Sequence, residues 1–124
     1  MRNANRGRLS KSFRCASEGL IYVLRQERNA RLHLLAALLT ILLGIWLDLS
    51  NTEWALISLA IAMVFVGEMF NTVVEVSIDM ITVDEHPLAK VAKDVAAGAI
   101  LLASLAAAII GALIFVPHLR EALA

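Results

Sequence analysis

The chain has 124 residues, of which 60% are hydrophobic and 6% aromatic, and its mean hydropathy is +0.76. Because an ordinary soluble domain contains only about 45–50% apolar residues, this composition disfavours that class and favours an all-α membrane protein whose helices face lipid. The single cysteine, Cys15, excludes a disulfide within the chain, and the formal net charge of zero conceals basic residues gathered near the N-terminus.

Residues 8–30 are expected to form an amphipathic helix that lies on the membrane surface. Apolar side chains recur at helical spacing between Phe13 and Leu24, and charged side chains occupy the opposite side. A secretory signal peptide is the alternative, but the basic region is too long and no cleavage site of small residues follows it. We therefore expect the segment to be retained.

Three apolar runs predict three transmembrane helices. Their expected bounds are 32–49, 53–80 and 87–116, with cytoplasmic extensions on the second and third. Eight of the eleven basic residues precede the first run, so the positive-inside rule places the N-terminus in the cytoplasm. Together with the surface helix, these spans make residues 1–124 a single membrane domain.

The ends of these spans carry recognisable signals. The segment Ser50–Glu53 matches a capping box that starts the second span, Pro87 suits the first turn of the third, and Pro117 ends its apolar run. Small residues at intervals of four, among them Gly44 and Gly111, favour close helix packing, although alanine is also simply abundant. Three short helices are too few to enclose a polar site, so an oligomer is expected.

The second span carries four polar side chains, Glu68, Asn71, Glu75 and Asp79. They fall within an arc of about 80°, so they share one face of the helix. At ~1.5 Å per residue from Trp54, Glu68 lies about 21 Å into a ~30 Å hydrocarbon layer, and Glu75 lies at its cytoplasmic edge. An intramembrane carboxylate costs on the order of 2.5–3.5 kcal/mol, which indicates a function. The alternative is a hydrogen bond between helices made by Asn71, with Glu68 kept protonated.

The difference in depth suggests different roles for these acids. Glu68, in a desolvated position, suits a general base acting on a group at the acyl-chain boundary. Glu75, at the aqueous edge, suits Mg²⁺, which binds one or two carboxylates together with phosphate oxygens and water. Glu27 precedes the first span at the same boundary and is the candidate second ligand. A surface ion pair with Arg31 is the alternative role for Glu27.

Basic residues at this boundary suit the neutralisation of a polyphosphate. The candidates are Arg8 in the surface helix and Lys93, which stands beside Asp94 at the start of the third span. For each cation alone, snorkelling or attraction to lipid headgroups is the competing interpretation. His33 and His118 are expected to be interfacial. The loop before the third span adds Asp84, Glu85 and His86, which suit contact with a nucleotide.

Three motifs resemble those of the small prokaryotic integral-membrane lipid kinases, a family that includes diacylglycerol kinase and undecaprenol kinase. They are ERNARLH at the foot of the first span, EMFNTVVEVSID, which is similar to the family's E-x-x-N-(S/T)-x-x-E-x-x-x-D signature, and HPLAKVAKDVAAGA at the start of the third. The resemblance covers nearly the whole chain. It implies a homotrimer in the inner or plasma membrane of a prokaryote, with active sites shared between subunits at the cytoplasmic interface.

By position, the resemblance assigns roles to the candidate residues. Glu68 would be the catalytic base that takes the proton of a lipid hydroxyl, and Asn71 would help to organise the site. Glu27 and Glu75 would hold the Mg²⁺ that bridges the phosphates of ATP. The other residues implied at the nucleotide are Arg8, Cys15, Asp84, Glu85, His86, Lys93 and Asp94. The implied partners are a lipid alcohol and ATP, and no nucleic acid.

The expected substrate is undecaprenol, with diacylglycerol as the alternative. The variants EMFNT, HPLAK and IFVPHL look more like the undecaprenol kinase branch, and Cys15 and His33 stand where the enterobacterial diacylglycerol kinase branch has an aromatic residue and a carboxylate. A small proton-coupled transporter and a structural membrane subunit are alternative functions. Acids clustered beside Lys93 disfavour the transporter, and the matching depth of Glu27 and Glu75 disfavours the structural subunit.

Overall fold

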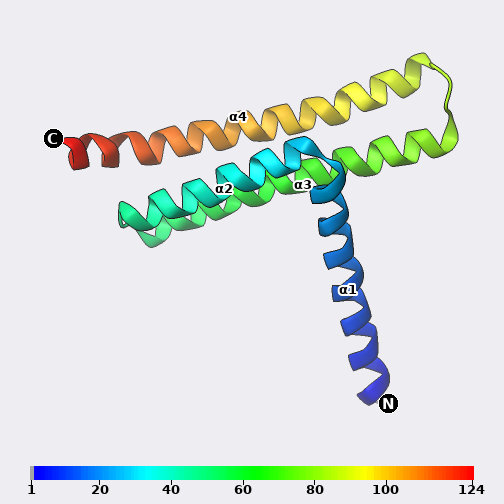
Figure 1. Ribbon diagram of the computed structural model, residues 1–124, viewed down its shortest axis with the longest axis horizontal. Coiled ribbons are helices and arrows are strands. Elements are labelled where there is room, and N and C mark those ends of the chain that lie inside the picture. Colours follow the sequence, from blue (N-terminus) through cyan, green and yellow to red (C-terminus); the bar gives the residue numbers. More distant parts are fainter. Residues whose placement is uncertain (1) are drawn as a thin grey trace.

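The computed structural model describes residues 2–124, and within that range the fold is all-helical (Figure 1). The elements are α1 (Arg2–Gln26), α2 (Arg28–Trp46), α3 (Asn51–Ile81) and α4 (Pro87–Leu123). By length and composition, α2, α3 and α4 can each cross a membrane, which confirms the prediction of three spanning helices. Met1, which the predicted domain includes, lies outside the described residues.

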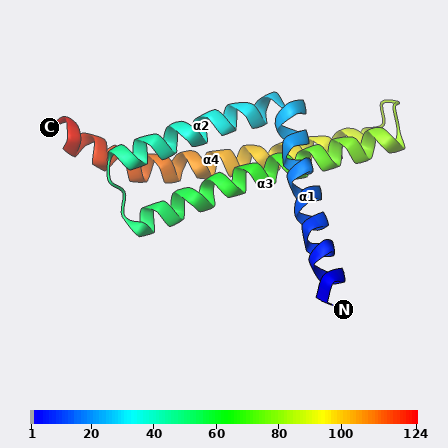
Figure 2. The same ribbon diagram turned by 60° about the horizontal axis from the view of Figure 1, so that its bottom comes forward.

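The three spanning helices lie lengthwise beside one another, and α1 runs crosswise to them (Figures 1 and 2). The most extensive packing is between α3 and α4, while α2 and α1 contact α3 less. A short connection over residues 82–86 links α3 to α4 at one end of the bundle, and the C-terminus lies at the other end (Figure 1).

The helix expected over 8–30 is interrupted at Glu27. This residue has extended backbone angles, φ −95° and ψ 117°, so α1 ends at Gln26 and α2 begins at Arg28. The Arg31 guanidinium donates from its Nη1 to the carbonyl oxygens of Leu24, at 3.3 Å, and Arg25, at 2.8 Å. Because these carbonyls end α1, the cation stabilises the break and allows α2 to leave in a different direction.

The turn between α2 and α3 begins earlier than the expected bound of 49. Asp48 has a φ of 54°, and the amides of Asp48 and Leu49 donate to the carbonyls of Ile45 and Gly44, at 3.3 and 3.2 Å. This is the bond pattern of a Schellman motif with aspartate in the left-handed position that glycine usually occupies. The buried Leu49 side chain then packs into the core with Leu43.

The capping box predicted at Ser50 and Glu53 is confirmed. The Glu53 amide donates to Ser50 Oγ at 3.3 Å, and the Ser50 amide donates to Glu53 Oε2 at 2.8 Å. The same carboxylate reaches α4, where His118 Nε2 lies 2.8 Å from Glu53 Oε1. A single acidic side chain therefore begins α3 and joins it to the far end of α4.

Pro87 occupies the first turn of α4, as predicted, but Pro117 does not end this helix at 116. The helix continues to Leu123 although Pro117 cannot donate to the carbonyl four residues earlier. Tertiary contacts hold the segment beyond the proline, because His118 meets Glu53 and Leu119 packs against the apolar core.

The apolar core lies toward the end of the bundle that holds the α2–α3 turn. Its buried members are Leu49, Ile57, Ile114 and Phe115. Gly44 is also buried there, and a Cβ at this position would lie 2.8 Å from Trp54 Cη2. Many other large apolar side chains of the spans are exposed on the single chain, as expected for surfaces that face lipid or another subunit.

Candidate active site

The polar face predicted on the second span lies on one continuous helix, α3. Exposure increases steadily along this face. Glu68 is 1% exposed and Asn71 is 7% exposed, whereas Glu75 is half-buried and Asp79 is exposed. Burial within the protein therefore decreases along this face of α3 from Glu68 to Asp79.

Glu68 meets a histidine from the neighbouring helix. His33 Nε2, on α2, lies 3.2 Å from Glu68 Oε1, and the side chains are 28% and 2% exposed. The geometry is that of a close ion-pair contact and not of a formed hydrogen bond, since Glu68 Oε1 is buried without a hydrogen-bond partner in the described part of the chain. His33 was expected to be interfacial, so sequence reasoning missed this contact.

Two further polar groups of α3 arrange the same face. Asn71 Nδ2 donates to Glu75 Oε1 at 3.1 Å, and Thr72 Oγ1 donates to the carbonyl of Glu68 at 3.0 Å. The Asn71 bond therefore lies within one helix, and among the described residues no bond from Asn71 to another helix is formed. Asn71 Oδ1 is buried and has no hydrogen-bond partner among the described residues.

Glu27 and Glu75 are both half-buried, Glu27 at the break between α1 and α2. Glu75 lies on the same face of α3 as Glu68, about two turns further along. The ion pair that was the alternative role of Glu27 is not formed, because Arg31 binds the end of α1 instead. Over residues 2–124 no cluster of three or more acids, histidines or cysteines is found that could hold a metal by itself.

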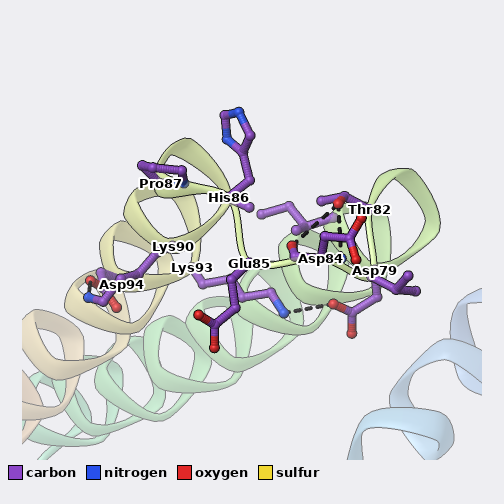
Figure 3. A pocket seen from close by; sticks show the side chains of 12 residues that line it. Asp79, Thr82, Asp84, Glu85, His86, Pro87, Lys90, Lys93 and Asp94 are labelled. Carbon is purple, nitrogen blue, oxygen red and sulfur yellow. Dashed lines mark hydrogen bonds and ion pairs between the residues drawn. The ribbon is translucent and has the colours of Figure 1, made fainter.

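Near the α3–α4 connection lies a cavity of about 990 Å³ (Figure 3). Its charged lining consists of four carboxylates and two lysines: Asp79, Asp84, Glu85, Asp94, Lys90 and Lys93. Lys93 Nζ donates to Asp79 Oδ1 at 2.7 Å, joining α4 to α3, and Lys90 pairs with Asp94 within α4. The cavity is therefore richer in negative than in positive side chains.

The connection itself is shaped by short-range hydrogen bonds. The Asp84 amide donates to Thr82 Oγ1 at 3.1 Å, and the Leu88 amide donates to His86 Nδ1 at 3.2 Å, so His86 is the N-cap of α4. The rest of the His86 ring points away from the carboxylates (Figure 3). Glu85 is exposed at the cavity.

The structure brings together only part of the predicted site. Asp84, Glu85, His86, Lys93 and Asp94 line one cavity. A separate group of more deeply placed side chains comprises Glu27, His33, Glu68, Asn71 and Glu75. Arg8 and Cys15 are exposed on the crosswise helix α1, and neither lines the cavity within the described chain.

Comparison with known proteins gives these two groups a context. The model of the family described as prokaryotic diacylglycerol kinase matches residues 14–115, which include both groups. The chain belongs to the prokaryotic diacylglycerol kinase family. Family membership and the three candidate spans together make it a multi-pass membrane protein.

Relatives within the prokaryotic diacylglycerol kinase family carry two different names. The chain is 44% identical over 112 residues to an undecaprenol kinase of Bacillus subtilis, covering 90% of this chain and 91% of the relative. It is 39% identical over 110 residues to a diacylglycerol kinase of Synechocystis, covering 87% of this chain and 62% of the relative. With a diacylglycerol kinase of Escherichia coli K12, identity is 27% over 111 residues, or 90% of this chain and 91% of the relative.

Proposed function

We propose that this protein is a lipid kinase that transfers the γ-phosphoryl group of ATP to the hydroxyl of undecaprenol. The observation that carries the proposal is the buried Glu68 on the polar face of α3, in a chain 44% identical to an undecaprenol kinase. Diacylglycerol is the second candidate substrate, because other relatives are named diacylglycerol kinases. A membrane-depth base suits the hydroxyl of either lipid.

In this proposal Glu68 is the catalytic base. Its carboxylate takes the proton of the lipid hydroxyl while the hydroxyl oxygen forms a bond to the γ-phosphorus. The bond from that phosphorus to the bridging oxygen of ADP breaks, and the electron pair leaves with ADP. Asn71 orients Glu75 through its 3.1 Å hydrogen bond. Burial excludes water, which favours transfer to the lipid over hydrolysis.

The donor set fits a nucleotide that carries Mg²⁺. Glu27 and Glu75 are half-buried carboxylates, and two such ligands suffice for Mg²⁺ when phosphate oxygens and water complete its coordination. When bound, the metal would neutralise phosphate charge during transfer. The nucleotide would extend toward the cavity at residues 82–86, where an excess of carboxylates disfavours a bare polyphosphate and suits its magnesium complex.

We further propose a homotrimer whose active sites are shared between subunits, as the family resemblance implies. The separation of Arg8 and Cys15 from the cavity supports this, because their contact with ATP requires α1 to meet another chain. The crosswise α1 would lie on the cytoplasmic membrane surface, with the N-terminus inside, since basic residues precede the first span.

The test uses purified protein in mixed micelles with labelled ATP and Mg²⁺, and offers undecaprenol and diacylglycerol separately. Glu68→Gln is expected to lower kcat by about 10²–10⁴-fold, the usual contribution of a general base. Glu121→Gln, a change at an exposed glutamate near the C-terminus, is the matched control. Label on one lipid that disappears only in Glu68→Gln supports the proposal and identifies the substrate. No label on either lipid, from folded protein, refutes it.

A further inference from the structure

We propose that His33 is the positioning residue that holds Glu68 as an aligned carboxylate during phosphoryl transfer. The inference rests on the proposed function and deepens it, because it adds a second residue to the base. It assigns a role to a side chain that sequence reasoning placed at the interface. The supporting observations are a contact distance, an unpartnered buried oxygen and the groove beside the ring.

The contact joins two helices at the most buried acid of the chain. His33 Nε2 on α2 and Glu68 Oε1 on α3 are 3.2 Å apart. Glu68 Oε1 has no hydrogen-bond partner among the described residues, so no hydrogen bond there competes with a substrate hydroxyl for this oxygen.

Polar partners for the Glu68 carboxyl group are few. Glu68 is 1% exposed, and His33 is the one side chain of the described residues that forms an ion-pair contact with it. Asn71, the next polar side chain on the same face of α3, donates to Glu75 instead. His33 is thus the side chain placed to hold the Glu68 carboxyl group.

The ring also borders the space from which an apolar substrate can approach. A groove of about 290 Å³ lies between α2, α3 and α4, and His33 is the one titratable residue in its described lining. The rest is small or apolar, including Ala37, Ala107 and Phe115. His33 therefore lies between this apolar groove and the carboxylate, where it can align Glu68 with a hydroxyl that enters from the membrane side.

The proton balance follows from this arrangement. Before the reaction, His33 Nε2 lies beside the Glu68 carboxylate. When Glu68 accepts the hydroxyl proton, the oxygen–phosphorus bond forms and ADP leaves with the electron pair of the broken bond. His33 exchanges no proton with the substrate, and it makes and breaks no bond with it. Its contribution is to orient the base.

The experiment measures kcat and the KM for ATP for the full chain in mixed micelles. His33→Gln is expected to lower kcat about 10-fold, as loss of an orienting partner commonly does. The KM for ATP should stay constant, because His33 contacts the base and not the nucleotide. His33→Lys keeps a nitrogen donor beside Glu68 and should recover much of the activity.

His118→Gln is the matched control, because it removes the other histidine–glutamate contact between helices, at 2.8 Å and far from Glu68. Its kcat and its KM for ATP should match those of the wild type. A His33→Gln change that falls on the KM for ATP as much as on kcat, no loss at all, or failure of both His33 variants to assemble would overturn the inference. If the wild type phosphorylates neither lipid, the proposed function fails and the inference fails with it. If the wild type is active and only the expected effects of the His33 variants are missing, the inference alone fails.

Discussion

Replacement of Gly44 by alanine should destabilise the protein. Gly44 is buried on α2, where a Cβ would lie 2.8 Å from Trp54 Cη2 and 2.9 Å from Leu49 Cδ1. Carbon atoms in good contact are about 3.5–4.0 Å apart. Trp54 and Leu49 both belong to the packed end of the bundle, and Leu49 follows the strained Asp48, so neither side chain can retreat without disturbing the turn.

The magnitude follows from two opposing effects. Overpacking a tight site typically costs about 1–3 kcal/mol. Alanine also favours a helix over glycine by about 0.5–1 kcal/mol, which offsets part of that cost. The Gly44→Ala variant should therefore lose about 1 kcal/mol of unfolding free energy relative to the wild type, and at most about 2.5 kcal/mol.

The assay is reversible unfolding in mixed micelles with increasing SDS, followed by circular dichroism and tryptophan fluorescence. Gly98→Ala is the matched control, because a Cβ at that position of α4 meets nothing within 4 Å. The control should be as stable as the wild type or more stable, by up to ~1 kcal/mol. A Gly44→Ala protein as stable as Gly98→Ala would refute the conclusion that α2 and the α3 start are in tight contact here.

Three further changes test other parts of the molecule. Glu75→Gln should raise the Mg²⁺ concentration that gives half-maximal activity by about 10-fold or more, because it removes a proposed carboxylate ligand. An unchanged Mg²⁺ titration would exclude Glu75 as a ligand. Lys93→Met should raise the KM for ATP by roughly 10- to 100-fold with the KM for lipid unchanged, since a charged hydrogen bond contributes about 1.5–3 kcal/mol. Equal changes in both constants would indicate a general distortion of the α3–α4 connection. Asp48→Val should destabilise the protein by about 1–2 kcal/mol because its φ is 54°, whereas Asp48→Gly should not; equal stability of the two variants in the SDS assay would contradict this.

Features encoded by neighbouring residues were predictable from the sequence. The capping box at Ser50 and Glu53 needs only residues three apart, and Pro87 acts through its own ring. The shared face of Glu68 and Glu75 follows from helical periodicity once α3 is unbroken. In each case local stereochemistry decides the structure, so the sequence carries the information within one or two turns.

Features that depend on distant residues were not predictable in this way. His33 and Glu68 come from different helices, and no local pattern indicates that they meet. The continuation of α4 past Pro117 depends on His118 reaching Glu53 at the start of α3. The break at Glu27 depends on Arg31 turning back to the end of α1 instead of pairing along its own helix. The packing of one helix against another decides all three.

The continuity of α3 has a consequence for how the protein handles two reactants from different phases. Lipid alcohols dissolve in the bilayer and nucleotides dissolve in water, and one unbroken rod carries both the deep Glu68 and the exposed Asp79. Their separation along the axis, about 16 Å, is set by the number of residues between them. Deleting a single residue between them would shorten this separation by about 1.5 Å and rotate one side chain by about 100° relative to the other about the helix axis. The segment should therefore accept many substitutions and almost no change in length.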